Sequence, residues 1–79
     1  MNVANISPIH SNGMRELNVL FNTLEKPYGK GDIVRFNLAY QRLYPILSRS
    51  EKLHAEKLVD SLIDNLEDES LASRIYGVV

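Results

Sequence analysis

The stretch "YPILSRSE", residues 44–51, separates two helical patterns and therefore decides what kind of fold the chain can form. Pro45 lacks the amide hydrogen that a helix interior needs, and its ring presses on the carbonyl four residues earlier, which predicts a kink or a stop near Tyr44. Ser48 and Glu51 then form the capping-box pattern, in which the two side chains bond each other's backbone amides at a helix start. A new helix is therefore expected here.

Apolar residues recur at steps of three and four on both sides of this stretch. The pattern covers residues 12–25 and 33–47 before the break and residues 49–67 after it. Such spacing places apolar side chains on one face of a helix, which buries that face in a shared core. Ser11 or Asn12 can cap the first helix. The three apolar stripes are Met14, Leu17, Leu20, Phe21 and Leu24; Ile33, Phe36, Tyr40, Leu43 and Leu47; and Ala55, Leu58, Val59, Leu62, Ile63 and Leu66.

A short fourth helix is predicted over residues 69–76. Acidic residues accumulate at 67–70, where they oppose the dipole at the end of a helix but suit the start of a new one. Asp68 is expected to cap this helix, and a frayed continuation of the third helix is the alternative. With no alternating β pattern and no linker, the sequence predicts an all-α fold. We expect a small bundle of three to four helices in one domain, residues 1–79, with an irregular arm over residues 1–11.

Composition restricts the classes of function. The chain has 79 residues, no cysteine and a formal net charge of −1. It therefore has no disulfide framework and no thiolate metal site, and bulk charge gives it no means of coating nucleic acid or anionic membrane. A core of this size contributes only about 3–5 kcal/mol, so self-association or partner binding is expected to add stability. No segment resembles a secretion signal or a membrane span, and a cytoplasmic location is expected.

Charge is divided unevenly along the chain. Residues 1–50 hold six basic and three acidic side chains, whereas residues 51–79 hold three basic and seven acidic ones. Arginines spaced by seven lie along one side of the second helix if that helix runs through Pro45. Acids spaced by four line one ridge of the third helix. The two rows are Arg35, Arg42 and Arg49, and Glu56, Asp60, Asp64 and Asp68.

These charged rows allow several interpretations. The arginines can pair with the acids in the same chain, pair with them across a dimer, or contact phosphate, and packed helices with complementary flanks favour the first two. The acidic row is either an ordinary solvated face or a docking ridge for a basic partner surface. Like charges at a spacing of four cost a few tenths of a kcal/mol per pair, which is why a function for the row is considered at all.

The segment "KPYGKGD", residues 26–32, resembles a phosphate-binding loop only superficially. A P-loop needs GxxxxGK followed by serine or threonine, and Asp32 places a negative charge where an anion would sit. We interpret the segment as a turn in which Pro27 ends the first helix, the glycines supply positive φ and Asp32 caps the second helix. Tyr28 and Lys30 are expected to be exposed at its tip as candidates for protein contact.

No residue pattern indicates catalysis. Neither His10 nor His54 has a set of ligands at the spacing of a helical metal site, and no serine has a histidine and an acid at a recognised spacing. We therefore expect no enzyme activity, no cofactor and no metal. Tyr44, beside Pro45 and Arg42, is the best candidate for an interface anchor, because tyrosine is common at such sites. A core position with a satisfied hydroxyl is the alternative.

Three functions follow as hypotheses. The first is a small regulatory or inhibitory protein that binds another protein as a homodimer, a kind frequent among bacterial and phage regulators. The second is a helix-turn-helix DNA-binding regulator that uses the 44–56 region, with Arg49, Ser50, Lys52 and His54 leading the recognition helix. The acids that follow on that helix would repel phosphate, which counts against this second hypothesis. The third is a structural subunit of a larger assembly.

Overall fold

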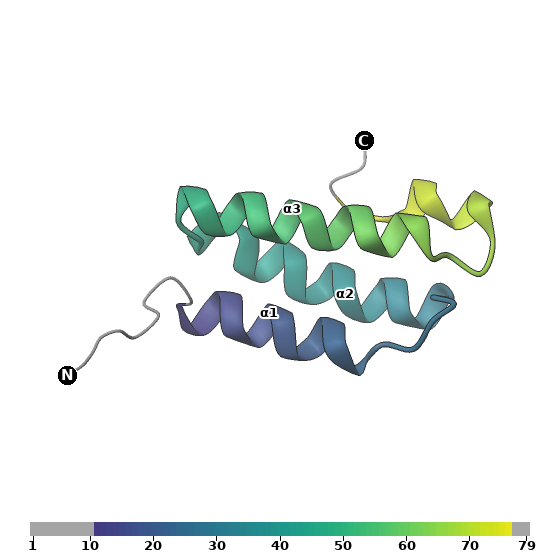
Figure 1. The fold of residues 1–79 in the computed structure, drawn as a ribbon, viewed down its shortest axis with the longest axis horizontal. Helices are drawn as coiled ribbons and strands as arrows, with labels where there is room; N and C mark the ends of the chain where they lie inside the picture. Colours follow the sequence, from purple (N-terminus) through teal and green to yellow (C-terminus); the bar gives the residue numbers. More distant parts are fainter. Residues whose placement is uncertain (1–10, 77–79) are drawn as a thin grey trace.

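Residues 11–76 are described by a computed structural model, in which three α-helices lie side by side and each runs antiparallel to the one before it (Figure 1). This arrangement confirms the predicted all-α bundle. Two short 3₁₀-helices complete it, one in the turn after the second α-helix and one near the carboxyl end. The elements are α1 (Asn12–Thr23), α2 (Lys30–Leu43), η2 (Tyr44–Ile46), α3 (Arg49–Asp64) and η3 (Glu69–Arg74). The predicted arm lies outside the described residues except for Ser11.

Serine side chains cap the starts of α1 and α3; Ser48 was predicted, and Ser11 was one of the two candidates for α1. The Ser11 hydroxyl accepts the amide of Met14 at 3.2 Å. At α3 the Ser48 hydroxyl accepts the amide of Glu51 at 3.3 Å, and a Glu51 carboxylate oxygen accepts the amide of Ser48 at 3.0 Å. The capping box is therefore confirmed, because both of its reciprocal bonds are made.

Pro45 stops α2 instead of kinking it. The α-helix ends at Leu43, four residues before the predicted end, because Pro45 has no amide to continue the hydrogen-bond ladder. The chain instead tightens into η2, where the Leu47 amide donates to the Tyr44 carbonyl at 3.1 Å. This turn reverses the chain, so that α3 returns alongside α2 (Figure 1).

The third helix ends at Asp64, three residues earlier than predicted. The carbonyl of Asn65 accepts the Tyr28 amide and the Glu67 amide donates to the Tyr28 carbonyl, both at 2.8 Å. These bonds join the loop after α1 to the loop after α3 in an isolated parallel bridge. The backbone groups of residues 65–67 that bond Tyr28 are therefore not available for the hydrogen bonds that would continue α3.

A separate fourth helix is present, but it is a 3₁₀-helix that ends at Arg74 and not at residue 76. The Asp68 carboxylate accepts the Ser70 amide at 3.0 Å, which confirms Asp68 as its cap and overturns the alternative of a frayed α3. Two bonds at 2.7 Å, made by the Asn37 side chain, tie the next residues to α2. Its amide group donates to the Arg74 carbonyl, and its oxygen accepts the Tyr76 amide.

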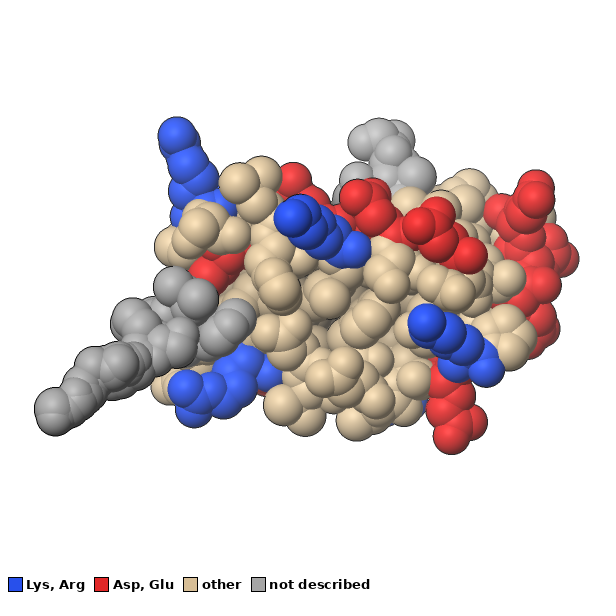
Figure 2. All heavy atoms as spheres, in the orientation of Figure 1, with Lys and Arg blue, Asp and Glu red and all other residues tan. Residues whose placement is uncertain are grey.

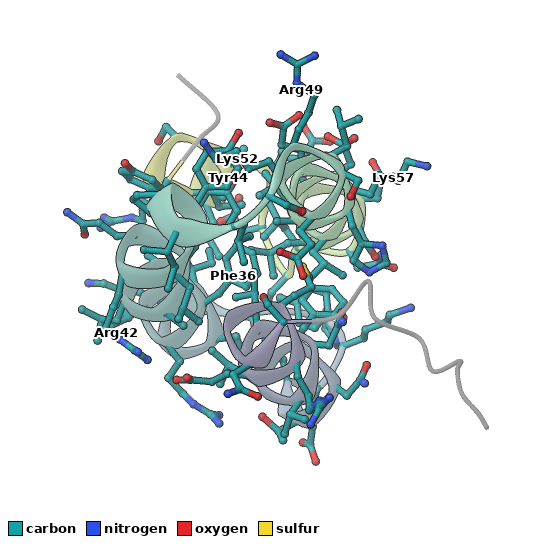
Figure 3. All side chains as sticks on the ribbon, turned by 90° about the vertical axis from the view of Figure 1, so that its left-hand side faces the viewer. Phe36, Arg42, Tyr44, Arg49, Lys52 and Lys57 are labelled. Atoms are coloured by element: carbon teal, nitrogen blue, oxygen red, sulfur yellow. The ribbon has the colours of Figure 1, made fainter. Side chains whose placement is uncertain are left out.

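The core lies between the three helices and consists of the predicted stripes. Phe36 is fully buried near the centre of the bundle, where it contacts Phe21 and Tyr40 at ring-centroid distances of 5.9 and 5.3 Å (Figure 3). Five of the stripe residues, Leu20, Phe21, Leu58, Ile63 and Leu66, are only half-buried at its edge. Residues that the stripes did not include are buried as well, and they are Tyr28, Ala39, Glu51 and Ile75.

Candidate functional site

The loop between α1 and α2 is a structural joint. Tyr28, predicted to be exposed, is 3% exposed, and its ring lies 5.7 Å from that of Phe21. That prediction was wrong because backbone hydrogen bonds to Asn65 and Glu67 hold Tyr28 against the loop that follows α3. Burial raises the pKa of the Tyr28 hydroxyl, and the negative charge of Asp32 raises it further.

The glycines of this loop do not act as predicted either. No described glycine has a positive φ; Gly29 is extended at φ −104°, and Gly31 lies within α2. The helix begins at Lys30, three residues earlier than predicted, and its N-cap is Gly29 instead of Asp32. Asp32 lies in the first turn, and its carboxylate accepts the Gly29 amide at 3.0 Å. A carboxylate in the first turn stabilises a helix almost as a cap does, so the sequence signal was sound but its position was misjudged. Lys30 is exposed, as expected.

The three arginines do not form one row. Because α2 stops at Leu43, Arg49 becomes the first residue of α3 and points away from the rest, whereas Arg42 lies on the opposite side of the bundle (Figure 3). Arg35 and Arg42 both reach toward α1. Arg35 Nη2 donates to the Thr23 hydroxyl at 3.1 Å, and Arg42 forms an ion pair with Glu16. Pairing with the acidic row within the chain, one of the three interpretations, is therefore not made among the described residues.

The acidic row is shorter than predicted. Glu56, Asp60 and Asp64 lie on α3 and are exposed, but Asp68 lies beyond the end of that helix, where it caps η3. The hydrogen bond from the backbone amide of Ser70 lowers the pKa of Asp68. Figure 2 shows acidic side chains over α3 and at the end of the bundle that carries η3. These residues form an exposed negative surface, and its role in docking stays a prediction.

Tyr44 makes several contacts within the chain. Its ring stacks on Tyr40 with a centroid distance of 5.0 Å, the Lys52 ammonium lies 5.3 Å from its centroid, and its hydroxyl donates to Glu56 (Figure 3). The bond to Glu56 raises the pKa of Tyr44, and burial raises that of Tyr40 to about 12. Tyr44 is thus half-buried at the edge of the core with its hydroxyl bonded, and a role as interface anchor stays a prediction.

A groove of about 520 Å³ runs between α1 and α2. Each helix lines it with four residues at relative positions 0, 3, 4 and 7, which is one face of a helix over two turns. The two charged or polar contacts described above cross it, Arg42 to Glu16 and Arg35 to Thr23. The lining residues are Glu16, Val19, Leu20 and Thr23 from α1, and Arg35, Leu38, Ala39 and Arg42 from α2.

The groove is apolar between these contacts. Val19 is 59% exposed and Leu38 is 65% exposed, although both are aliphatic side chains on stable helices. Val34, one turn before Leu38 on the same ridge of α2, is 49% exposed. This site could not be predicted from the apolar stripes, because they assign helix faces only from the residues that face the core. The signal that was available is the set of aliphatic residues on α1 and α2 that those stripes leave out.

The candidate DNA-binding region has a different geometry from a helix-turn-helix. In that motif the two helices cross at about 90–120°, whereas α2 and α3 lie side by side and antiparallel (Figure 1). Within residues 11–76 no group of three or more potential metal ligands comes together. In the same part of the chain, no helix has both the length and the apolar character needed to cross a membrane.

Comparisons of the chain with protein-family models, with curated proteins and with solved structures found no match. The geometry of the bundle, and above all the α1–α2 groove, is therefore the basis for inferring a function.

Proposed function

We propose that this protein is a non-enzymatic regulator that acts by binding another protein in the α1–α2 groove. The observation that carries the proposal is the exposure of Val19 and Leu38, both more than half exposed, between two charged ends. An apolar patch rimmed by polar residues is typical of an interaction site. Helical domains commonly receive partner segments in such grooves.

The chemistry of the lining residues favours binding over catalysis. The groove contains alkyl side chains, two guanidinium groups, one carboxylate that is already paired, and one hydroxyl. That hydroxyl, of Thr23, donates to the Leu20 carbonyl at 2.6 Å and accepts from Arg35. It is therefore not poised beside a general base, as a nucleophile would have to be.

The charge arrangement supports a monomeric binding protein in place of the homodimer expected from the sequence. A dimer that joined Arg35 and Arg42 of one copy to the acidic row of another would use two different faces of each molecule. Such a head-to-tail contact closes into a ring or grows into a filament and does not form a simple dimer. Likewise, the antiparallel course of α2 and α3 gives no support to the DNA-binding hypothesis.

A pair of matched variants tests the proposed function. Leu38→Lys places a charge in the groove, whereas Leu53→Lys changes an equally apolar side chain on α3, 58% exposed, that does not line it. Lysine and leucine have similar helix propensities, so both variants should keep the fold. In an affinity capture from native host cells, we expect Leu38→Lys to lose the captured partner and Leu53→Lys to keep it. Equal capture by the two variants would refute the use of the groove.

A further inference from the structure

The geometry of the groove also points to what fills it. Resting on the proposed function, we propose that the occupant is an amphipathic α-helix of another protein with the pattern acid–x–x–apolar–apolar–x–x–acid. Its two apolar residues would pack on Val19 and Leu38, and its two carboxylates would meet Arg35 and Arg42.

The length of the groove sets the spacing of this pattern. Arg35 and Arg42 are seven positions apart on α2, which corresponds to about 10.5 Å along a helix axis. Two carboxylates seven residues apart on a facing helix span the same length. Side chains at relative positions 0, 3, 4 and 7 share one face, so the apolar pair falls between the carboxylates and over the apolar part of the groove.

The charges of the groove select an acidic partner. The rim holds two arginines and one acid, so it carries a net positive charge. Arg35 has only the neutral Thr23 hydroxyl as a hydrogen-bond partner among the described residues, and Arg42 pairs with Glu16 at an exposed site. Exposed ion pairs contribute only about 0–1 kcal/mol, so an incoming carboxylate can share or replace them at little cost. Arginine also binds carboxylates in a two-pronged geometry, which gives such contacts direction.

The shape of the groove selects a helix. α1 and α2 are antiparallel neighbours, and α3 lies on one side of the pair (Figure 1). The Arg42 side chain projects on the side away from Arg49 and Lys57 of α3 (Figure 3). A helix laid there would complete a four-helix bundle, in which side-chain ridges of one helix fit grooves between its neighbours.

The sequence argues that this helix does not come from a second copy. Acids seven positions apart occur as Glu25 with Asp32 and as Asp60 with Glu67. The first pair encloses Tyr28 and Gly29, in a loop, and the second encloses Ile63 and Asp64. Neither provides two exposed apolar residues on a helix, so the required pattern is missing from this chain.

Two synthetic peptides test the proposal directly. Both are stapled helices with leucine at relative positions 3 and 4; one carries glutamate and the other lysine at positions 0 and 7. Binding is measured by fluorescence anisotropy at low salt to the wild type, to Arg35→Glu, and to Arg49→Glu as the control with the same net charge. We expect the wild type to prefer the glutamate peptide. Arg35→Glu should lower the affinity for the glutamate peptide by about tenfold and should raise the affinity for the lysine peptide. Arg49→Glu should change neither affinity.

The outcomes that overturn the proposal are distinct. Equal affinity for the two peptides, no measurable binding of the glutamate peptide to the wild type, or equal effects of Arg35→Glu and Arg49→Glu would each refute an acidic helix as occupant. A dimer that Leu38→Lys disrupts would show that a second copy fills the groove and would refute it too. The peptide results leave the capture experiment above standing, so failure of the acidic helix as occupant is distinguishable from failure of the proposed function, whereas a dimer through the groove would count against both. Because the comparison of the two peptides on the wild type needs no variant, the proposal stays testable even if a variant does not fold.

Discussion

Glu51 joins the starts of two helices that are far apart in the sequence. One carboxylate oxygen accepts the Ser48 amide at the start of α3, and the other accepts the Ser11 amide at the start of α1 at 2.7 Å. The side chain is only 6% exposed, the single buried charge among the described residues. Two helix amino termini, each with a positive end of the dipole, therefore share one negative group.

This geometry predicts acid sensitivity. Backbone hydrogen bonds from Ser11 and Ser48 lower the pKa of Glu51 from 4.5 to about 2. Because the folded-state pKa lies below that of the unfolded chain, the contribution of Glu51 to stability is complete above about pH 5 and is lost as the pH falls toward about 2. We expect Glu51→Gln to be less stable than the wild type at neutral pH, with a difference that shrinks over this range. Urea denaturation at a series of pH values measures it.

The control for this prediction is Glu25→Gln, which neutralises an exposed carboxylate in the loop after α1. That variant should keep the pH profile of the wild type. The free energies of unfolding of Glu51→Gln and the wild type could instead differ by the same amount at neutral and at acidic pH. In that case the carboxylate would not act through its charge, and only the packing of its side chain between the starts of α1 and α3 would explain the effect.

The starts of the helices are set by local contacts, whereas the end of α3 is set by a contact that is distant in sequence. The caps at Ser11, Ser48 and Asp68 are local, since a side chain bonds an amide two or three residues away. The sequence predicted Ser48 and Asp68, and it offered Ser11 as one of two candidates. The ends of α1, α2 and α3 were predicted less well. The end of α3 is set by Tyr28, which is distant in sequence, and local spacing contains no information about such a contact.

Glycines in the first turns of α1 and α2 give a prediction for the helices themselves. Gly13 and Gly31 are both the second residue of their helix. Alanine restricts the unfolded chain and favours a helix, so each change to alanine should stabilise the protein by about 0.5–1 kcal/mol. A Cβ at residue 13 would lie 3.5–3.6 Å from side-chain atoms of Leu43, Ile46 and Leu47, an ordinary contact, whereas at residue 31 it would meet nothing within 4 Å.

Thermal and urea denaturation of the two variants separate the causes. Similar gains for Gly13→Ala and Gly31→Ala would indicate helix propensity alone, and an additional gain at residue 13 would measure the new contact with η2. A loss of stability at residue 13 with a gain at residue 31 would contradict the packing described here, because it would mean that α1 and η2 have no room for a methyl group.

At the scale of the whole molecule, the sequence predicted the helices and the core far better than the surface. The apolar stripes around Leu17, Phe36 and Leu62 follow from spacing alone, because a buried face repeats with the helix period. The groove does not, since Val19 and Leu38 come to line one groove only once α1 and α2 are placed side by side. The row of three arginines failed for the same reason: it required a helix that continues through Pro45, and the stop at Leu43 leaves Arg49 on another helix and another face.

This placement of charges leads to a prediction for the free protein. The positive groove and the negative surface of α3 lie on different sides of the bundle, so their attraction would drive head-to-tail association, and that contact would lack an apolar pattern complementary to Leu38. We therefore expect a monomer by analytical ultracentrifugation at low salt and at about 1 M salt, where surface charges are screened. The matched variant is Arg42→Glu, which should also be a monomer. A dimer that dissociates at high salt and is weakened by Arg42→Glu would instead show that the copies pair through charge, and the groove would then be a self-association surface.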